Sequence, residues 1–273
     1  MATPRVELLV VRAFGDFEWH RRGGRVSFKL AVLSDVHGNA VALEAVRKAV
    51  KREKPDAILV AGDLVMNGPD PAGAVDALRD MESSGAIIVQ GNTDVAVADY
   101  DYAAAFPWFS EGVPAAFQAA AEWAHDQLGD ERLEWIRRLP SERRVRDGGT
   151  LVLLTHASPG SQTAGFDLDL DPSTTLERLS RTDARIICCG HTHMPNVRDF
   201  GWQMIVNDGS AGYVFDGDPT ASWALVTIDG DAVTAEIKRT EYDTMTVSNA
   251  ISARGLAGDV YRAATVRTGK LVR

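Results

Sequence analysis

Five apolar segments of this chain each end in a short polar cluster, and no other feature limits the fold as much. Each segment has the length and composition of a buried β-strand. They cover residues 28–33, 57–61, 86–90, 150–154 and 185–189. Apolar residues at helical spacing fill the two intervals between the first three segments. This β-α-β-α-β order of fully apolar strands predicts an α/β fold with helices on both faces of a sheet.

The remaining elements and the domain limits follow from the same periodicities. Helical stripes at 117–128 and 133–139 form a helical insertion at about 95–140. Other elements are a strand at 143–145, a helix near 173–180, strands at 203–206, 223–228 and 232–238, and a helix after Asp243. We expect a single domain over residues 26–273, with a tail from Tyr261 that is either docked or frayed. Residues 1–25 form an N-terminal extension that is flexible or carries a short strand at 7–11.

Composition narrows the functional classes. The net charge of −9 argues against a general nucleic-acid-binding protein, because such proteins carry a basic face. No apolar run approaches the ~18 residues of a membrane span. Cys188 and Cys189 are adjacent in a strand, where neighbouring side chains point to opposite faces, which argues against a disulfide between them. Two buried thiols and the lack of a signal-peptide pattern predict a cytoplasmic protein.

The polar clusters carry the chemistry. In chain order they are Asp35-Val36-His37-Gly38-Asn39, Gly62-Asp63, Gly91-Asn92-Thr93-Asp94, Thr155-His156 and Gly190-His191-Thr192-His193. Open α/β sheets bind ligands beyond the carboxyl ends of their strands, so we expect the clusters to meet at one rim. Carboxylate, imidazole and amide oxygen without thiolate suit Mn, Fe, Zn or Ni. The clusters therefore predict a site for divalent transition metals.

Spacing within the clusters predicts how two ions are shared. Alternate side chains of an extended segment point the same way, so Asp35 and His37 can reach one ion. The same spacing lets His191 and His193 serve two neighbouring ions. The carboxylate of Asp63 can bridge both.

The series resembles the calcineurin-like metallophosphoesterase superfamily, whose motifs are D-x-H, GD, GN, H and GHxH. The resemblance extends over about residues 26–243 and is strongest to small bacterial and archaeal phosphodiesterases. Further segments that share it are residues 67–71, 207–210 and 216–219. Val95 and Ala96 stand where the protein phosphatases of the superfamily carry an arginine.

The resemblance implies a fold, a ligand set and a reaction. The fold is a four-layer αββα sandwich of two mixed sheets, with the site at the rim between them. The first ion is held by Asp35, His37 and His193, and Asp63 bridges to the second. Asn92, His156 and His191 complete the second ion, and Asp63 and Asn92 are also catalytic. The implied enzyme is a phosphodiesterase that attacks a small phosphoester with a metal-bridging hydroxide.

Several alternatives stay open at this point. The enzyme could instead be a phosphomonoesterase or a dinucleoside polyphosphate hydrolase acting on a nucleotide-like substrate. A non-catalytic scaffold that kept the fold is a further alternative from a different class. The native metal, the substrate and the formation of a homo-oligomer are not determined by the sequence.

Two catalytic positions are less well defined than the metal ligands. Many members of the superfamily carry a histidine after the asparagine of the third motif, where it acts as a general acid, but this chain has Thr93. A threonine hydroxyl is a poor proton donor, so Asp94, His125 or water would have to replace that histidine. Asn39 either orients the phosphate or caps the following helix.

Aromatic residues gather between residues 100 and 135. They are Tyr100, Tyr102, Phe106, Trp108, Phe109, Phe117, Trp123 and Trp135. They could form a cap that contacts the substrate, or they could pack against the sheet or a partner subunit. We favour packing for most of them and expect Trp108 and Phe109 to be the best candidates for substrate contact.

Overall fold

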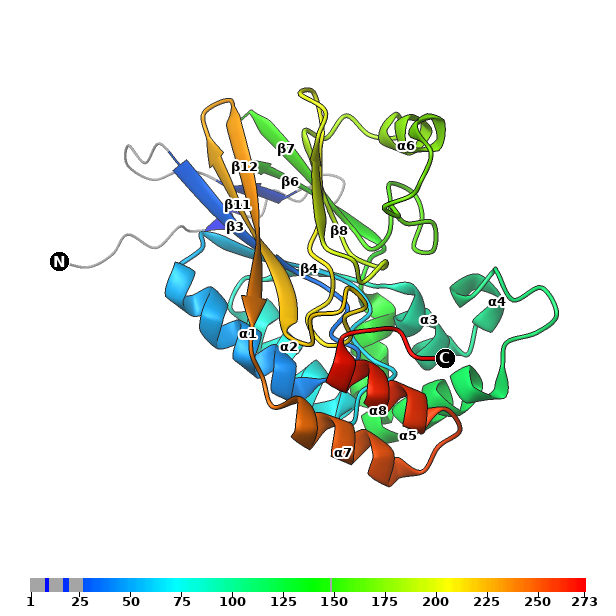
Figure 1. Ribbon diagram of the computed structural model, residues 1–273. Coiled ribbons are helices and arrows are strands. Elements are labelled where there is room, and N and C mark those ends of the chain that lie inside the picture. The colour runs from blue at the N-terminus through cyan, green and yellow to red at the C-terminus, as the bar shows by residue number, and fades with distance from the viewer. Residues whose placement is uncertain (1–7, 10–16, 20–26, 148) are drawn as a thin grey trace.

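The computed structural model describes residues 27–147 and 149–273, together with two short strands nearer the amino terminus (Figure 1). Two mixed β-sheets pack face to face, and helices cover the outer face of each. The fold is therefore the four-layer αββα sandwich that the resemblance implies. None of the helices in the described ranges combines the length and hydropathy needed to cross a membrane.

The first sheet has the strand order β12-β11-β3-β4-β5. Its strands are β3 (Ser27–Leu33), β4 (Ala57–Ala61), β5 (Ile87–Val89), β11 (Ala221–Asp229) and β12 (Ala232–Thr240). Strands β3, β4 and β5 are parallel, and β11 pairs antiparallel with both of its neighbours. The carboxyl ends of the three parallel strands therefore lie at the same edge.

The second sheet has the order β1-β2-β6-β7-β8-β10-β9. Its strands are β1 (Leu8–Leu9), β2 (Phe17–Trp19), β6 (Glu142–Asp147), β7 (Thr150–Thr155), β8 (Ile186–Cys189), β10 (Met204–Asn207) and β9 (Asn196–Asp199). Strands β7, β8 and β10 are parallel. The sequence patterns predicted all of the longer strands, but they did not predict β9, which is short and only partly buried.

Packing on both faces explains why the central strands are apolar throughout. In β3, Leu30 and Val32 belong to the core between the two sheets. The alternate residues Ala31 and Leu33 face the helices and belong to the core that includes Leu43 of α1 (Ala40–Glu53). Both sets are fully buried, as the two-residue period of a strand requires when both faces are covered.

This arrangement corrects the prediction of helices on both faces of one sheet. Each sheet carries helices on one face and the other sheet on its opposite face. A strand buried beneath a sheet has the same apolar sequence as a strand buried beneath a helix, so the pattern could not distinguish them. The five cluster-bearing strands accordingly divide into β3, β4 and β5 in one sheet and β7 and β8 in the other.

The helices that the periodicities predicted are all present. Helix α2 (Pro71–Ser83) begins at Pro71, with Asp70 accepting a capping hydrogen bond from Gly73 N. The remaining helices are α3 (Asn92–Asp99), α4 (Tyr102–Ala105), α5 (Ala115–Arg138), α6 (Pro172–Leu179), α7 (Thr244–Arg254) and α8 (Asp259–Thr268). Of these, α3 and α4 were not predicted. Helix α5 contains both predicted stripes and is interrupted at Gly129, whose φ of 68° is left-handed. The tail from Tyr261 is docked as part of α8.

The N-terminal extension is described only at β1 and β2. Strand β1 lies within the predicted strand at 7–11, and β2 pairs in parallel with β6. The rest of residues 1–25 lies outside the described residues. The domain limits at residues 25 and 26 therefore stay a prediction.

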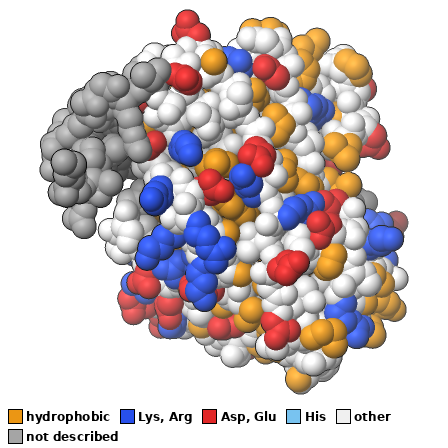
Figure 2. All heavy atoms as spheres, turned by 60° about the vertical axis from the view of Figure 1, so that its left-hand side comes forward, with side chains coloured by type: hydrophobic (Ala, Val, Ile, Leu, Met, Phe, Trp, Pro, Cys, Tyr) orange, Lys and Arg blue, Asp and Glu red, His pale blue; other side chains and the backbone are white. Residues whose placement is uncertain are grey.

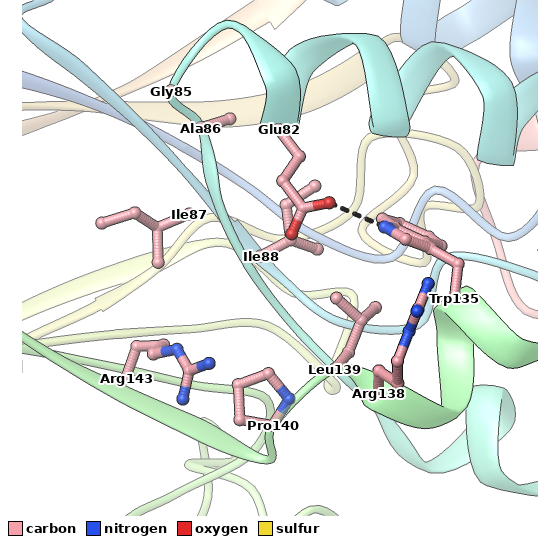
Figure 3. A pocket seen from close by; sticks show the side chains of 10 residues that line it. All are labelled: Glu82, Gly85, Ala86, Ile87, Ile88, Trp135, Arg138, Leu139, Pro140 and Arg143. Atoms are coloured by element: carbon pink, nitrogen blue, oxygen red, sulfur yellow. Dashed lines mark hydrogen bonds between the residues drawn. The ribbon is translucent and has the colours of Figure 1, made fainter. Parts of the chain in front are cut away.

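Most residues of the aromatic segment pack into the helical layer. Trp135 is buried, and its indole N–H donates to Glu82 Oε2 at 2.7 Å. Figure 3 shows this pair at the end of α5, where Arg138 and Arg143 line a small cavity of about 370 Å³ beside β5. The cavity has no cluster of metal-ligating side chains among the residues that line it. This packing confirms the structural interpretation for Trp135.

The described surface carries basic and acidic side chains close together. Figure 2 shows basic side chains gathered beside acidic ones on the face that includes the left-hand side of Figure 1, where α1 and β12 lie. On these two elements Lys48 Nζ lies 3.4 Å from Glu44, and Lys238 Nζ lies 2.9 Å from Glu236. The basic charge on this face is therefore partly neutralised, unlike that of a nucleic-acid-binding surface.

Candidate metal centre

The predicted ligands meet where the carboxyl ends of both sheets come together. Asp35 and His37 follow β3, Asp63 follows β4, and Asn92 begins α3 directly after β5. From the second sheet, His156 follows β7, and His191 and His193 follow β8. All of these side chains except that of His191, which is partly exposed, are buried.

The backbone conformation that brings these side chains together was not predicted from the sequence. Asp35, His37, Asp63, His191 and His193 all have positive φ angles, between 51° and 70°. The prediction of an extended path through Asp35 and His37 is therefore wrong, although both side chains reach the same place. Left-handed backbone at non-glycine residues costs free energy and is concentrated at functional sites. Here it turns the chain sharply after β3, β4 and β8 and directs polar atoms into one space.

The first set of donor atoms comes from Asp35, His37, Asp63 and His193. One ligand atom from each lies within 4.8 Å of all the others. His193 Nε2 lies 3.2 Å from Asp35 Oδ1 and 3.1 Å from His37 Nε2. His37 Nε2 is 3.6 Å from Asp63 Oδ2.

The second set lies on the other side of the Asp63 carboxylate. His156 Nε2 is 3.3 Å from Asp63 Oδ1 and 3.0 Å from Asn92 Oδ1. His191 Nδ1 is 3.1 Å from Asn92 Oδ1 and 3.3 Å from His156 Nε2. The two oxygens of Asp63 thus face different sets of donors.

Backbone carbonyls orient the histidines. His156 Nδ1 lies 2.7 Å from Ala61 O, and His193 Nδ1 contacts Tyr213 O. A ring that donates from Nδ1 keeps the lone pair of Nε2 free, and Nε2 is the atom that faces the cluster in both residues. Asn92 is oriented in the same way, since its Nδ2 donates to Ala105 O at 3.1 Å and Oδ1 faces the cluster.

The buried donors fit divalent cations. Asp35 Oδ1 is buried without a hydrogen-bond partner, although Asp35 Oδ2 accepts from Ser34 Oγ and His191 N. His37 Nε2 and His193 Nε2 also face each other at 3.1 Å, and each presents a lone pair to the same space when its ring is protonated on Nδ1. A cation would satisfy the unpaired carboxylate oxygen and both lone pairs together. The buried Asp/His cluster therefore has the composition and the unpaired atoms of a divalent-metal site.

Electrostatics keeps the two carboxylates ionised. Burial opposes ionisation of Asp35, but the nearby His193 and His37 hold its pKa well below the usual range. Burial likewise opposes ionisation of Asp63, and His156 and His37 lower its pKa to about 2. In the metal-free protein burial disfavours the charged form of His156, but Asp63 raises the pKa of that ring to about 10. Burial and the charge of His156 lower the pKa of His191 to about 4.

Asp94 and Asn39, the two further catalytic candidates, both make hydrogen bonds with backbone N–H groups. Burial and the charge of Asp63 raise the pKa of Asp94 to about 7. Its two oxygens accept from the backbone N–H groups of Gly91, Leu64 and Val65. Asn39 caps α1 by accepting from Ala42 N at 3.0 Å. Neither residue is among those that line the cavity above the metal site.

The other candidates for the missing general acid are also engaged elsewhere. Thr93 lines the cavity, but its hydroxyl donates to Val65 O at 3.1 Å. His125 lies outside the cavity lining, where Nδ1 is 2.7 Å from Val97 O and the ring stacks on Tyr100. Thr93, Asp94 and His125 are thus all engaged in contacts with the backbone.

A cavity of about 630 Å³ opens above the cluster. His37, Asp63, Asn92, His191 and His193 form its floor. The walls come from the segment between α4 and α5 and from α8 with the residues that follow it. Trp108 and Phe109 both line this cavity, as the sequence suggested.

A buried ionic cluster supports the site and was not identified from the sequence. Arg254 and Arg262 both contact Asp259, at 2.6 and 3.1 Å. Arg254 also donates to the carbonyls of Asn67 and Gly68, and Arg262 donates to Asn67 Oδ1 at 3.2 Å. The side chain of Asn67 lies 3.4 Å from His37 Nδ1. The α7–α8 pair therefore holds the loop beside a predicted metal ligand, through contacts between residues almost 200 positions apart.

Known proteins are similar to this chain in sequence and in fold. The calcineurin-like phosphoesterase superfamily domain matches residues 28–231. An uncharacterized protein of Methanocaldococcus jannaschii, MJ0912, is 27% identical over 233 residues, which are 80% of this chain and 89% of that protein. A metallophosphoesterase from Sphaerobacter thermophilus is 27% identical with a TM-score of 0.66, and the match covers 89% of this chain and 99% of that one.

A further solved structure shows the same fold at lower identity. The hypothetical protein PH1004 from Pyrococcus horikoshii is 20% identical with a TM-score of 0.76, over 89% of this chain and 98% of that one. The family match includes the five strands that precede the polar clusters, except for Ser27 of β3. It also includes all of the predicted metal ligands. The chain belongs to the calcineurin-like phosphoesterase superfamily.

Proposed function

We propose that this protein is a phosphodiesterase that binds two divalent metal ions. The observation that carries the proposal is the position of Asp63, whose two carboxylate oxygens face two different sets of donors. Asp35, His37 and His193 would hold one ion, and Asn92, His156 and His191 the other. Asp63 would bridge them.

The charge of the ligand set supports an anionic substrate. Asp35 and Asp63 are the only carboxylates in the two sets, so two divalent cations would leave the site with net positive charge. This local charge would attract a phosphoester to a protein whose overall charge is −9. Two bound ions supply an activated water and a clamp for the phosphate oxygens. The protein contributes orientation of that clamp through the carbonyls behind His156 and His193.

The cavity supports a diester as the substrate class. A phosphodiester carries two substituents, and the space of about 630 Å³ is large enough for both. Two arginines line it, Arg262 and Arg273. Arg262 already contacts Asp259, Asn67 and two backbone carbonyls. Arg262 therefore has little capacity left for the extra charge of a monoester or polyphosphate, which leaves Arg273 as the second basic side chain of the wall. The two buried free thiols, Cys188 and Cys189, support a reducing, cytoplasmic compartment as the place where the protein acts.

The proposal is tested with bis-p-nitrophenyl phosphate and a panel of Mn, Fe, Zn and Ni. We expect two equivalents of metal per chain and hydrolysis that a chelator removes and added metal restores. A monoester or a dinucleoside polyphosphate turned over faster than the diester would point to those enzyme classes. Protein that binds no metal and hydrolyses none of these compounds would identify a scaffold.

Turnover should depend steeply on the leaving group. The alternatives considered for the proton donor, Thr93, Asp94 and His125, are all held by backbone contacts, so the leaving oxygen departs without a side-chain acid. General acid catalysis typically contributes roughly 10²–10⁴-fold. We expect methyl p-nitrophenyl phosphate to be hydrolysed roughly 10²-fold faster than methyl phenyl phosphate, measured as kcat/KM. Similar rates for the two esters, or a preference for unactivated alkyl monoesters, would contradict this prediction.

Metal loading should release a proton near pH 7.5. The pKa of about 10 means that His156 is protonated in the metal-free protein, and a protonated ring cannot bind a cation. We expect about one proton per chain to be released on addition of Mn²⁺. Calorimetric titration in two buffers of different ionisation enthalpy measures this number. A binding enthalpy independent of the buffer would show that His156 is already neutral, and the variant His156→Asn is the matched control.

A further inference from the structure

The cavity above the metal site is polar at its floor and more aromatic toward its opening. Its floor consists of the polar cluster, whereas a large part of its wall is aromatic. Trp108 lies next to the floor, with its ring centroid 6.2 Å from that of His191. Despite its size and apolar character, Trp108 is 51% exposed. Exposed tryptophan at the edge of a site is typical of a surface that contacts a ligand.

The position of Trp108 is held by other aromatic residues. Phe106 is buried and makes an edge contact with the Trp108 ring at 5.8 Å. Phe109 and Phe117 pack edge-on against Phe106, at 6.3 and 5.4 Å. A backbone hydrogen bond from Phe109 N to Phe106 O closes the turn that carries Trp108. This support reduces the conformational entropy that Trp108 would lose on contacting a ligand.

A second half-exposed aromatic residue reaches the same cavity from the other end of the chain. Tyr261 of α8 lines the cavity and is 49% exposed. Figure 1 shows the segment after α8 running toward α3, and Leu271 and Val272 of that segment also line the cavity. Helix α8 lies beyond the matched superfamily domain, which ends at residue 231. The aromatic part of the cavity wall is therefore formed by two segments far apart in the sequence, namely the α4–α5 connection and α8.

We propose that Trp108 and Tyr261 bind an aromatic ring carried by one substituent of the substrate phosphodiester. The proposal rests on the proposed function, because the phosphate would lie on the metal site at the floor of the same cavity. Rings stack on aromatic side chains through their faces, so either a phenyl group or a nucleobase satisfies this chemistry. The substrate class is thus an aryl or nucleoside phosphodiester, and not a simple dialkyl one.

Equilibrium binding tests the proposal without depending on turnover. Diphenyl phosphate, dimethyl phosphate and the methyl ester of thymidine 5′-monophosphate carry the same single charge and differ in their substituents. With Mn²⁺-loaded protein we expect the aromatic esters to bind roughly fivefold to 100-fold more tightly than dimethyl phosphate, which is the range for stacking of one ring. The comparison of diphenyl phosphate with the thymidine ester distinguishes a phenyl-binding from a nucleobase-binding site.

Variants assign this preference to the two residues. Trp108→Ala and Tyr261→Ala should each reduce the preference severalfold or more, while Trp108→Phe retains part of it. Trp202→Ala is the matched control, because Trp202 is 54% exposed but does not line the cavity. Circular dichroism and thermal unfolding of each variant confirm that the fold is intact.

The outcomes separate the two proposals. Equal affinity for the aromatic and methyl esters, or a preference that survives both alanine variants, would overturn the aromatic site. Selective binding that is lost in the alanine variants would support that site even if bis-p-nitrophenyl phosphate is not hydrolysed. Failure of that hydrolysis would overturn the proposed reaction alone.

Discussion

Replacing Asp63 with asparagine should lower kcat/KM for bis-p-nitrophenyl phosphate by roughly 10³-fold or more. The substitution keeps the size of the side chain but removes one charge and one of the two oxygens that face the donor sets. A pair of bound ions stabilises the transition state by several kcal/mol, and each tenfold loss corresponds to about 1.4 kcal/mol. Metal content, measured by atomic emission, should fall below two equivalents in the same variant.

The control for this variant is Asp130→Asn, which removes the same charge from an exposed position in α5 outside the cavity lining. It should retain both the activity and the metal content of the parent. An Asp63→Asn protein that keeps two metal ions and normal turnover would disprove the bridging assignment. Loss of activity with full metal content would instead mean that Asp63 acts on the substrate without holding the ions.

Replacing Asp259 with alanine should reduce the free energy of unfolding by about 3–5 kcal/mol. Asp259 is buried and contacts the guanidinium groups of Arg254 and Arg262, which are themselves 5% and 8% exposed. Removing one partner of a buried ion pair leaves an uncompensated charge, and this loss is typically of that size. Here two arginines would lose their carboxylate, although their contacts with backbone carbonyls would remain. Urea denaturation of the metal-free protein measures the change.

The matched control is Asp76→Ala, which removes a carboxylate from a surface ion pair. Asp76 is 50% exposed and binds Arg132 through both oxygens. Solvent screens such a pair, so we expect a loss below about 1 kcal/mol. A similar loss of unfolding free energy in the two variants would show that the buried ion pairs of α7 and α8 stabilise the fold no more than a surface pair does. A small loss for Asp259→Ala would also weaken the view that these helices hold the loop at Asn67.

The predicted metal ligands could be selected from the sequence because each one is close to a strand end. A strand made only of apolar residues is expected to be buried in a sheet. The residues that follow it then lie at the edge of that sheet. The structure brings Asp35, His37, Asp63, Asn92, His156, His191 and His193 together as expected from their order. The distances from the two oxygens of Asp63 to different donors are the basis for the proposed assignment to two ions.

The second class of candidates shows where residue type is insufficient. Asn39 and Asp94 stand beside the ligands in sequence, yet both turn toward backbone N–H groups. A carboxylate or amide that caps a turn and one that contacts a substrate have the same identity and nearly the same position along the chain. Only the direction of the side chain distinguishes them, and for these two residues that direction depends on neighbouring loops.

Local sequence by itself determined the strands, the main helices and the set of polar residues at the strand ends, because periodicity and capping depend on residues a few positions apart. The tertiary structure decided that the strands form two sheets, that Asp63 directs its oxygens to two donor sets, and that α7 and α8 support the loop beside His37. These features depend on contacts between distant residues, such as Arg262 with Asn67. No short-range pattern encodes such contacts, since they form only when the whole chain has packed.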